Sequence, residues 1–272
     1  MKHRKVRIDF SNALPHWNPA EPEFSQRQNA ASTVLPHLEP YLNKVMKLAK
    51  DQLADTDAVL KDEIAVFIKQ EANHYKQHQA FNRTLYDHGY EKLKVYEAGL
   101  QQDYDQFLKQ RSLKFNLAYS EGFESSGIVV AEFFFKHASR WLDNADDSVK
   151  KLWLWHLAEE FEHRTVCYDV YQRLYGSYFY RIYGLLYAMV HLFSYGGRVG
   201  RYLITQDRES GCIVNDWQSR WRLLRFQVFQ SVYLGFKMLR VLSPFYDPTN
   251  YAMPKAAEQV LAEADLATST AN

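Results

Sequence analysis

The sequence is poor in several features that would define a class of protein. Its two cysteines, Cys167 and Cys212, are too few for a disulfide framework and fit a reducing compartment. The formal net charge is only +1, so composition gives no support for nucleic-acid binding. The basic N-terminal segment lacks the apolar core of a signal peptide, which predicts a cytoplasmic location. Ile182–Gly197 is free of Asp, Glu, Lys and Arg, but it is shorter than the ~20 residues of a spanning helix.

Helical periodicity dominates what remains, and no segment has a persuasive strand pattern. We therefore expect an all-α protein, with a four-helix bundle and additional helices packed against it at the C-terminal end. Residues 1–31 contain three prolines and no helical period, so they are expected to form an extended arm, with Trp17 as its anchor. Residues 32–245 should form the helical domain, and residues 246–272 a tail with one short helix. The expected helices cover about residues 36–53, 57–89, 92–109, 112–141, 146–176, 178–206 and 216–242.

The stretch from Trp155 to His163 carries the strongest chemical signal. On a helix, His156, Glu160 and His163 follow one another at spacings of four and three residues and so share one face. Apolar residues at the same spacing surround them, so this face is predicted to be buried. Burying these groups without partners would cost several kcal/mol, and a metal ion is the simplest compensation.

Three other predicted helices carry ionisable residues within apolar ridges. Glu71 and His74 repeat the Glu-x-x-His spacing, Glu124 lies alone in its ridge, and Glu39 lies at the entrance of the first expected helix because Pro40 fits only a first turn. A buried Glu or His taken singly is commonly paired with Arg or with another such residue. The ordered set of six is better explained by a dinuclear metal site with these predicted ligands: Glu39, Glu71, His74, Glu124, Glu160 and His163.

Four carboxylates neutralise the charge of two divalent ions. Imidazole and carboxylate donors together suit iron, which is the favoured metal, or manganese, and zinc is a further alternative. His78 and His156 each lie one turn from a Glu-x-x-His pair. Each is a further ligand, a hydrogen-bond partner of a ligand, or a plain core histidine. Glu121 either supports a ligand or pairs with a neighbour. Glu159 and Glu162 point about 100° away from the ligand face and are expected to be in solvent.

Two segments resemble motifs of a bacterial family labelled "predicted metal-dependent hydrolase". The segment from Phe67 to Asn82 is similar to Phe-Ile-x-Gln-Glu-x-x-His-x-x-x-His-x-x-x-Asn, and the segment from Trp155 to His163 is similar to Trp-His-x-x-Glu-Glu-x-Glu-His. The resemblance covers roughly residues 15–240 and implies a ferritin-like fold with metal-dependent chemistry. The family's segments around Glu124 and Glu39 are only partly kept, and Pro40 is an addition.

Three functions are compatible with such a site. The sequence favours an oxidoreductase whose di-iron centre activates dioxygen to oxidise an apolar organic substrate, because carboxylates tolerate changes in metal charge and Tyr and Phe are abundant. The first alternative is a hydrolase that uses a metal-bound hydroxide. The second is a non-catalytic metal-binding protein, although the chain has no acidic runs typical of storage. The catalytic residues, the substrate and the oligomeric state are not defined by the sequence.

The helix that contains Ile182–Gly197 has two interpretations. The favoured one is that it caps the bundle or lines a substrate channel. The alternative is contact with a membrane surface, with Arg181, Arg198 and Arg201 on anionic lipid while Leu185, Leu186, Met189 and Leu192 dip inward. In that case the protein would be peripheral to the inner membrane.

Overall fold

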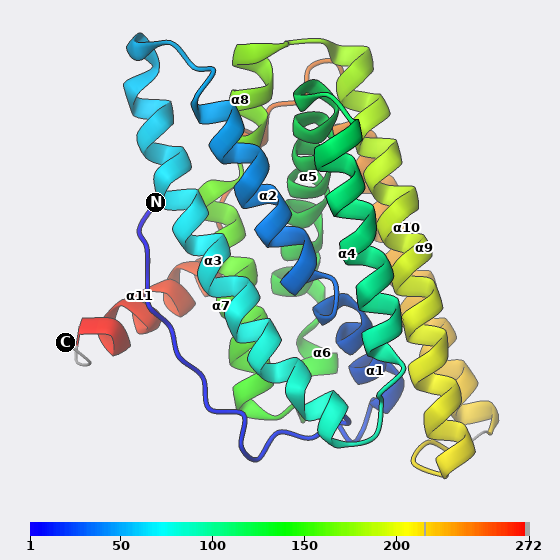
Figure 1. The fold of residues 1–272 in the computed structure, drawn as a ribbon. Coiled ribbons are helices and arrows are strands. Elements are labelled where there is room, and N and C mark those ends of the chain that lie inside the picture. Colours follow the sequence, from blue (N-terminus) through cyan, green and yellow to red (C-terminus); the bar gives the residue numbers. More distant parts are fainter. Residues whose placement is uncertain (215, 270–272) are drawn as a thin grey trace.

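The computed structural model describes residues 1–214 and 216–269, which form helices joined by short connections and contain no strand (Figure 1). The all-α prediction is therefore confirmed for this part of the chain. In order, the helices are α1 (Pro22–Ser32), α2 (Leu35–Lys50), α3 (Ala58–Asp87), α4 (Leu93–Gln110), α5 (Leu113–His137), α6 (Ser139–Leu142), α7 (Asp147–His163), α8 (Val166–Leu174), α9 (Tyr178–Ser210), α10 (Trp217–Val241) and α11 (Lys255–Ser269), with short 3-10 turns at Asp55–Asp57 and Pro248–Asn250.

Local sequence signals explain where several helices begin and end. The Ser112 hydroxyl accepts the N–H of Phe115 at 3.2 Å at the start of α5. The Asp146 carboxylate accepts the N–H of Ser148 at 2.9 Å at the start of α7. Gly176 follows α8 with a φ of 60°, in the left-handed region that ends helices at little cost for glycine.

The helices that carry the predicted ligands enclose a common interior. Helix α2 packs against α3 and α5, and α7 packs against the same two helices. Around these four, α4 packs on α2 and α5, α9 packs along α5, α10 contacts α5, and α11 contacts α7 (Figure 1). Helices α2, α3, α5 and α7 thus contact one another around the candidate site, with α9, α10 and α11 packed outside them.

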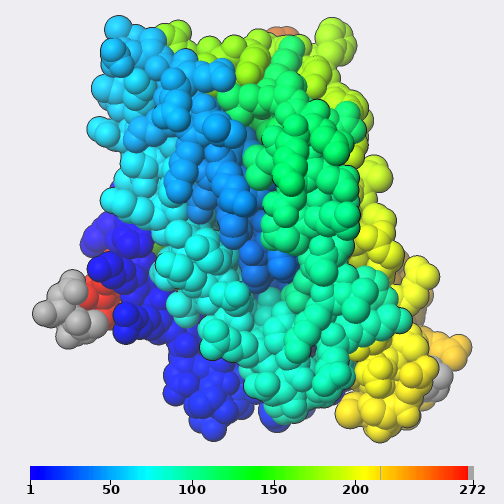
Figure 2. Space-filling view, in the orientation of Figure 1, coloured from blue at the N-terminus to red at the C-terminus, as the bar shows by residue number. Residues whose placement is uncertain are grey.

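The expected extended arm is non-helical only before Pro22, with turns between residues 11 and 20, because residues 22–32 form α1. This helix has no apolar period since it buries polar side chains that find partners. The Asn29 amide, for example, donates to the Pro15 carbonyl and accepts from the Trp17 indole, each at 2.9 Å. Trp17 is buried, as expected of an anchor. Figure 2 shows the first residues of the chain lying against α3, where the Asn73 amide donates to the Arg4 carbonyl.

Helix α2 begins at Leu35, before the start near Pro36 to Pro40 that the sequence suggested. Only Thr33 and Val34 separate the two helices, and Val34 itself has helical backbone angles. Pro40 therefore lies inside α2 rather than in its first turn, and Glu39 is within the helix and fully buried. The other expected helix ends agree within a few residues, except that the helix expected over 146–176 is interrupted after His163 and the one expected over 112–141 after His137. Residues 270–272 of the expected tail lie outside the described part of the chain.

Two residues of α9 that the lipid interpretation placed at a membrane surface are buried inside the protein. Arg181 is 2% exposed and forms an ion pair with Glu121, and Leu185 is fully buried. Leu185 lies in the contact with α5, where its backbone would be only 2.5 Å from a Cβ added at Gly122. The alternative interpretation of this helix, which placed Arg181 and Leu185 at a lipid surface, is therefore wrong for these two residues. Within the described residues, none of the helices combines the length and the apolarity needed to cross a bilayer.

Candidate metal centre

Four helices bring buried carboxylates and imidazoles into one cluster. Helix α3 contributes a glutamate and a histidine one turn apart, α7 contributes two histidines and a glutamate, and α2 and α5 contribute one glutamate each. All are at most 4% exposed, and they comprise Glu39, Glu71, His74, Glu124, His156, Glu160 and His163. The structure therefore brings together all six residues predicted as ligands, with His156 as a seventh member.

Three subsets of this cluster are close enough to share an ion. Within each subset, one donor atom per residue lies within 4.8 Å of the others. The subsets are Glu39 with His74 and His156, Glu71 with His74 and Glu160, and Glu71 with Glu124 and His163. Because Glu71 and His74 each belong to two subsets, two neighbouring ions could share ligands from one turn of α3.

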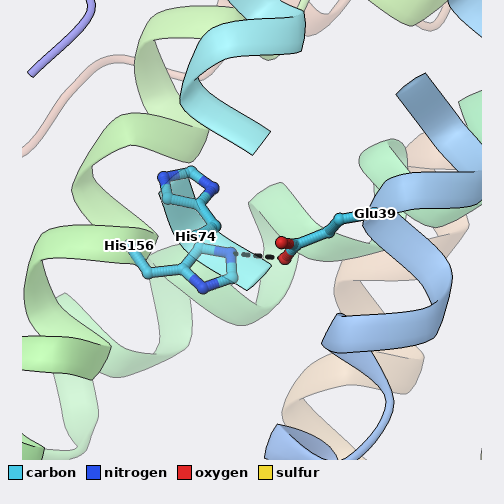
Figure 3. A group of neighbouring side chains, drawn as sticks. All are labelled: Glu39, His74 and His156. Carbon is cyan, nitrogen blue, oxygen red and sulfur yellow. Dashed lines mark ion pairs between the residues drawn. The ribbon is translucent and has the colours of Figure 1, made fainter. Parts of the chain in front are cut away.

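Figure 3 shows the first subset, with the Glu39 carboxylate pointing from α2 toward His156. Glu39 Oε1 is 3.6 Å from His156 Nε2, which is long for a hydrogen bond. The rings of His74 and His156 stack with centroids 4.1 Å apart. The two imidazoles therefore face the same carboxylate from neighbouring positions on α3 and α7.

His163 lies among three carboxylates. Its Nε2 is 3.4 Å from Glu71, 3.5 Å from Glu124 and 3.4 Å from Glu160. Two donor atoms that are each about 2.1 Å from the same ion at a tetrahedral or octahedral angle are about 3.0–3.4 Å apart. The spacing around His163 is therefore closer to that of ligands than to that of short hydrogen bonds.

The cluster contains donor atoms without hydrogen-bond partners among the described residues. Both oxygens of Glu39 and of Glu124 lack one, as do Glu71 Oε1, His74 Nδ1 and His163 Nε2. A buried polar atom without a partner costs about 1–3 kcal/mol, and a charged one costs more. Seven such atoms in one place fit residues whose partners are metal ions, and oxygen with imidazole donors suits iron, manganese or zinc.

The imidazoles of His74 and His163 each form a hydrogen bond through the ring nitrogen that points away from the cluster. His74 Nε2 lies 2.9 Å from Glu159, which leaves Nδ1 facing the cluster. His163 Nδ1 lies 3.2 Å from the Gln70 amide oxygen, which leaves Nε2 facing the cluster. Metal-binding histidines characteristically use one ring nitrogen for the ion and the other for such a partner.

His156 is oriented by a chain that leads away from the cluster. Its Nδ1 is 2.8 Å from His78 Nε2, and His78 Nδ1 is 2.9 Å from the Ser32 hydroxyl. That hydroxyl donates to the Asn82 amide oxygen at 2.6 Å. His78 thus supports His156, and in the described structure it belongs to none of the three close subsets.

Glu159 was expected to be in solvent, and this expectation is wrong. The residue is fully buried and contacts His74 as well as Arg4, whose Nη1 lies 3.1 Å from its carboxylate. Arg4 also binds Glu162 at 2.7 Å and Asp265 on α11 at 2.8 Å. Burial would raise the pKa of Glu159, but the hydrogen bonds from His74 and Arg4 lower it overall. The N-terminal segment therefore supplies a buried cation, Arg4, to Glu159. No sequence motif near α7 indicated this contact.

Burial and mutual repulsion raise the pKa values of two carboxylates in the cluster. Burial, and then the charge of Glu71, raise the pKa of Glu39 well above its usual range. Burial, and then the charge of Glu160, do the same to Glu124. Burial would lower the pKa of His74, but Glu159 and Glu71 raise it well above its usual value. Adding cations at the centre would relieve the repulsion among these carboxylates.

Glu121 lies outside the three close subsets. Its Oε1 accepts hydrogen bonds from Arg181 at 3.2 Å and from Ser125 at 2.7 Å. Burial raises its pKa, while Arg181 acts in the opposite direction. Of the two interpretations given for Glu121, the pairing with a neighbour is the one that these contacts describe.

A cavity of about 240 Å³ reaches the cluster from the side of α9 and α10. His156 and Glu160 lie at its inner end, and Gly127 lines it next to them. A Cβ added at Gly127 would lie 3.2 Å from Glu160 Oε2, so the glycine keeps that carboxylate accessible. Most of the remaining wall is apolar, with residues such as Leu35, Phe123, Val130, Met189, Leu192 and Met238.

Fold and site together define an all-helical protein whose buried carboxylates and imidazoles could hold metal. A family model described as "Predicted metal-dependent hydrolase" matches residues 2–252. The chain therefore belongs to the predicted metal-dependent hydrolase family, as its two motifs indicated. A search of curated proteins and a search of solved structures each give no significant match.

Proposed function

We propose that the protein is a metal-dependent hydrolase that cleaves an ester or amide bond of an apolar substrate. The observation that carries the proposal is the cavity, whose apolar walls end on His156 and Glu160 of the candidate metal centre. The family description supports hydrolysis over the oxidative chemistry that the sequence favoured.

The proposed cofactor is a pair of divalent ions held by the six predicted ligands together with His156. Four glutamates would balance the charge of two ions, and the distribution over four helices matches the ligand pattern of ferritin-like dinuclear bundles. Iron, manganese and zinc all suit this donor set. When bound, the ions would supply Lewis-acid activation of water and of the bond to be cleaved.

The chain's own residues would bind and orient the substrate. The apolar walls would hold a hydrocarbon group and exclude bulk water from the reacting bond. Gly127 leaves space for that bond beside Glu160 Oε2. Arg27, which also lines the cavity, would be available to an anionic or carbonyl group at the other end of the substrate.

The test is a hydrolysis assay of the zinc-loaded and manganese-loaded protein under nitrogen. Ester and amide substrates with acyl chains of increasing length should be turned over, with kcat/KM rising with chain length until the cavity is filled. Glu160→Ala should abolish this turnover. The matched control Glu91→Ala removes an exposed glutamate of the loop before α4 and should leave the turnover unchanged.

The second candidate function is the oxygen-activating oxidase or oxygenase, supported by the predominance of four buried carboxylates in the donor set. In that case the zinc form would be inactive under nitrogen, and the reduced iron form would consume dioxygen. Metal binding without either activity would instead support the non-catalytic alternative.

A further inference from the structure

Helix α9 exposes an unbroken line of large apolar side chains. The residues follow one another at spacings of four and three, so they lie on one face of the helix. All are at least 45% exposed: Phe179, Tyr183, Leu186, Val190 and Phe193. The opposite face of α9 is buried against α5, so this line is not needed for the packing of the bundle.

Helix α10 carries a second line of the same kind. It extends over the whole helix, again at spacings of three and four residues, and consists of Trp217, Trp221, Leu224, Val228, Val232, Phe236 and Leu239. Each of these side chains is at least half exposed. Contiguous apolar surface of this extent is rare on a protein that has no partner for it. We call the two lines together the α9/α10 face.

Apart from Asp207 and Glu209 in the last turn of α9, the charged residues of the two helices are all basic. Residues 178–206 and 217–246 contain no Asp or Glu, whereas they include eight Arg or Lys residues. Some of the basic residues are engaged inside the protein, such as Arg222 with Glu23 and Lys237 with Glu132. Arg198 and Arg201 are exposed; Arg201 continues the apolar line of α9 at helical spacing, and Arg198 lies beside the line. An apolar face flanked by exposed cations is complementary to a surface of anionic lipid headgroups over acyl chains.

A second copy of the chain fits this face less well. A two-fold dimer places the same surface patch on both partners, so the cations of one copy would meet those of the other. Neither α9 before Asp207 nor α10 has an acidic residue to pair with them. Like charges brought together in an interface oppose association.

We propose that the α9/α10 face binds the surface of an anionic lipid bilayer, with both helices lying along the surface and the bundle outside it. Trp217 and Trp221 would lie at the headgroup level, which is the position that tryptophan prefers. The proposal rests on the two exposed apolar lines and on the basic residues beside them. It can therefore be tested independently of the proposed function.

The position of the cavity extends the proposal to the substrate, and this step rests on the proposed function. The cavity lies between α9 and α10, and Phe193 belongs both to its wall and to the exposed line. Part of its wall is therefore next to the proposed lipid-binding face. An apolar ester or amide dissolved in the bilayer could enter the cavity without crossing water, which points to an acyl lipid as the class of substrate.

The test is co-sedimentation of the full chain with phosphatidylglycerol vesicles, phosphatidylcholine vesicles and mixtures of the two. The protein should sediment with the anionic vesicles and stay in the supernatant with pure phosphatidylcholine at physiological salt. Val190→Glu with Val232→Glu should weaken vesicle binding at least tenfold. Val59→Glu with Val95→Glu is the matched control, because it adds the same charge at valines of similar exposure (74% and 70%, against 71% and 68%). The control should change vesicle binding less than twofold.

Tryptophan fluorescence gives a second readout of position. Trp217 and Trp221 are the exposed tryptophans, while the other four are at most 4% exposed. Brominated acyl chains in the vesicles should quench emission of the wild-type protein, and Trp217→Phe with Trp221→Phe should remove most of that quenching.

Three results would overturn the proposal. The first is wild-type protein that stays in solution with anionic vesicles at low salt. The second is an equal loss of vesicle binding in the two valine pairs. The third is a dimer that Val190→Glu with Val232→Glu dissociates, which would assign the face to a second copy. Hydrolysis of a soluble short-chain ester, measured in the same variants, separates failure of lipid binding from failure of the proposed function.

Discussion

Glu97 is a buried carboxyl on α4 that belongs to no part of the metal centre. Its two oxygens accept the hydroxyl of Tyr86, each at 2.7 Å. Burial raises its pKa to about 7, although Tyr86 and then Lys94 act in the opposite direction. The folded protein therefore holds a proton at this position that the unfolded chain releases near pH 4.5.

The sign of this linkage gives a prediction for stability. Since the folded pKa is the higher one, the contribution of Glu97 is fully present below about pH 4.5 and is lost as the pH rises through 7. Glu97→Gln stays neutral and can still accept from Tyr86. We expect this variant to exceed the wild type in free energy of unfolding by about 1–3 kcal/mol at pH 8, and to match it near pH 4.5. Urea denaturation at both pH values measures the difference.

The control for this prediction is Glu91→Gln, which removes the same charge at an exposed position nearby. Its effect should be small and the same at both pH values. A Glu97→Gln effect that does not change with pH would contradict the assigned protonation.

At the scale of single residues, the sequence identified the side chains of the centre but not those that hold them. Glu71, His74, Glu160 and His163 were recognisable because two Glu-x-x-His pairs fell on apolar ridges. Glu159 was misplaced because helical geometry was applied to α7 alone. Its spacing of three from His156 was the available signal that it faces α3. Arg4 carried no signal, since only folding brings it to α7.

At the scale of helices, the contact between α5 and α9 depends on glycines. A Cβ added at Gly184 would lie 2.4 Å from the backbone carbon of Ala118, and one at Gly122 would lie 2.5 Å from the Leu185 Cα. Backbone atoms cannot move aside as a flexible side chain can, so the two helices would have to separate. This close approach positions α9 as one wall of the cavity.

We therefore predict that Gly184→Ala lowers the free energy of unfolding by about 1–3 kcal/mol, the range for overpacked cores. Gly99→Ala in α4 is the matched control, because no atom lies within 4 Å of a Cβ added there. Replacing this helical glycine should raise stability by about 0.5–1 kcal/mol. Chemical denaturation of both variants measures these opposite signs. A Gly184→Ala variant that is stabilised as much as Gly99→Ala would show that the contact accommodates a Cβ and that only helix propensity acts.

The positions of most helices followed from the sequence, and the exceptions have physical reasons. Helix α1 escaped notice because its buried face is polar and held by specific hydrogen bonds such as that between Asn29 and Pro15. No sequence pattern predicted the interruption between α7 and α8 after His163 either. The outward line on α9 was underestimated because a helix with apolar residues on two sides does not reveal which side the bundle covers.

At the scale of the whole molecule, the candidate centre connects four helices that are distant in sequence. Glu39 belongs to α2, Glu71 to α3, Glu124 to α5 and Glu160 to α7. Their repulsion is a cost to the folded protein without metal, and the unfolded chain has no preformed site. Ions that bind only the folded protein stabilise it by mass action, by about 2.7 kcal/mol at a free concentration of 100 times Kd.

The last prediction follows from this coupling. Loading the purified protein with zinc or manganese should raise its Tm by about 5–10 °C, since each kcal/mol shifts the Tm of a chain of this size by about 2–4 °C. Elemental analysis should give about two ions per chain, the number that four carboxylates neutralise.

Glu124→Ala should lose most of the bound metal and of the Tm increase while keeping the helical circular dichroism spectrum, because the core around the centre is largely apolar. Glu91→Ala should behave as the wild type. A protein that binds less than about half an ion per chain after reconstitution, with the same Tm in chelator and in metal, would show instead that the cluster is a network of hydrogen-bonded and protonated side chains.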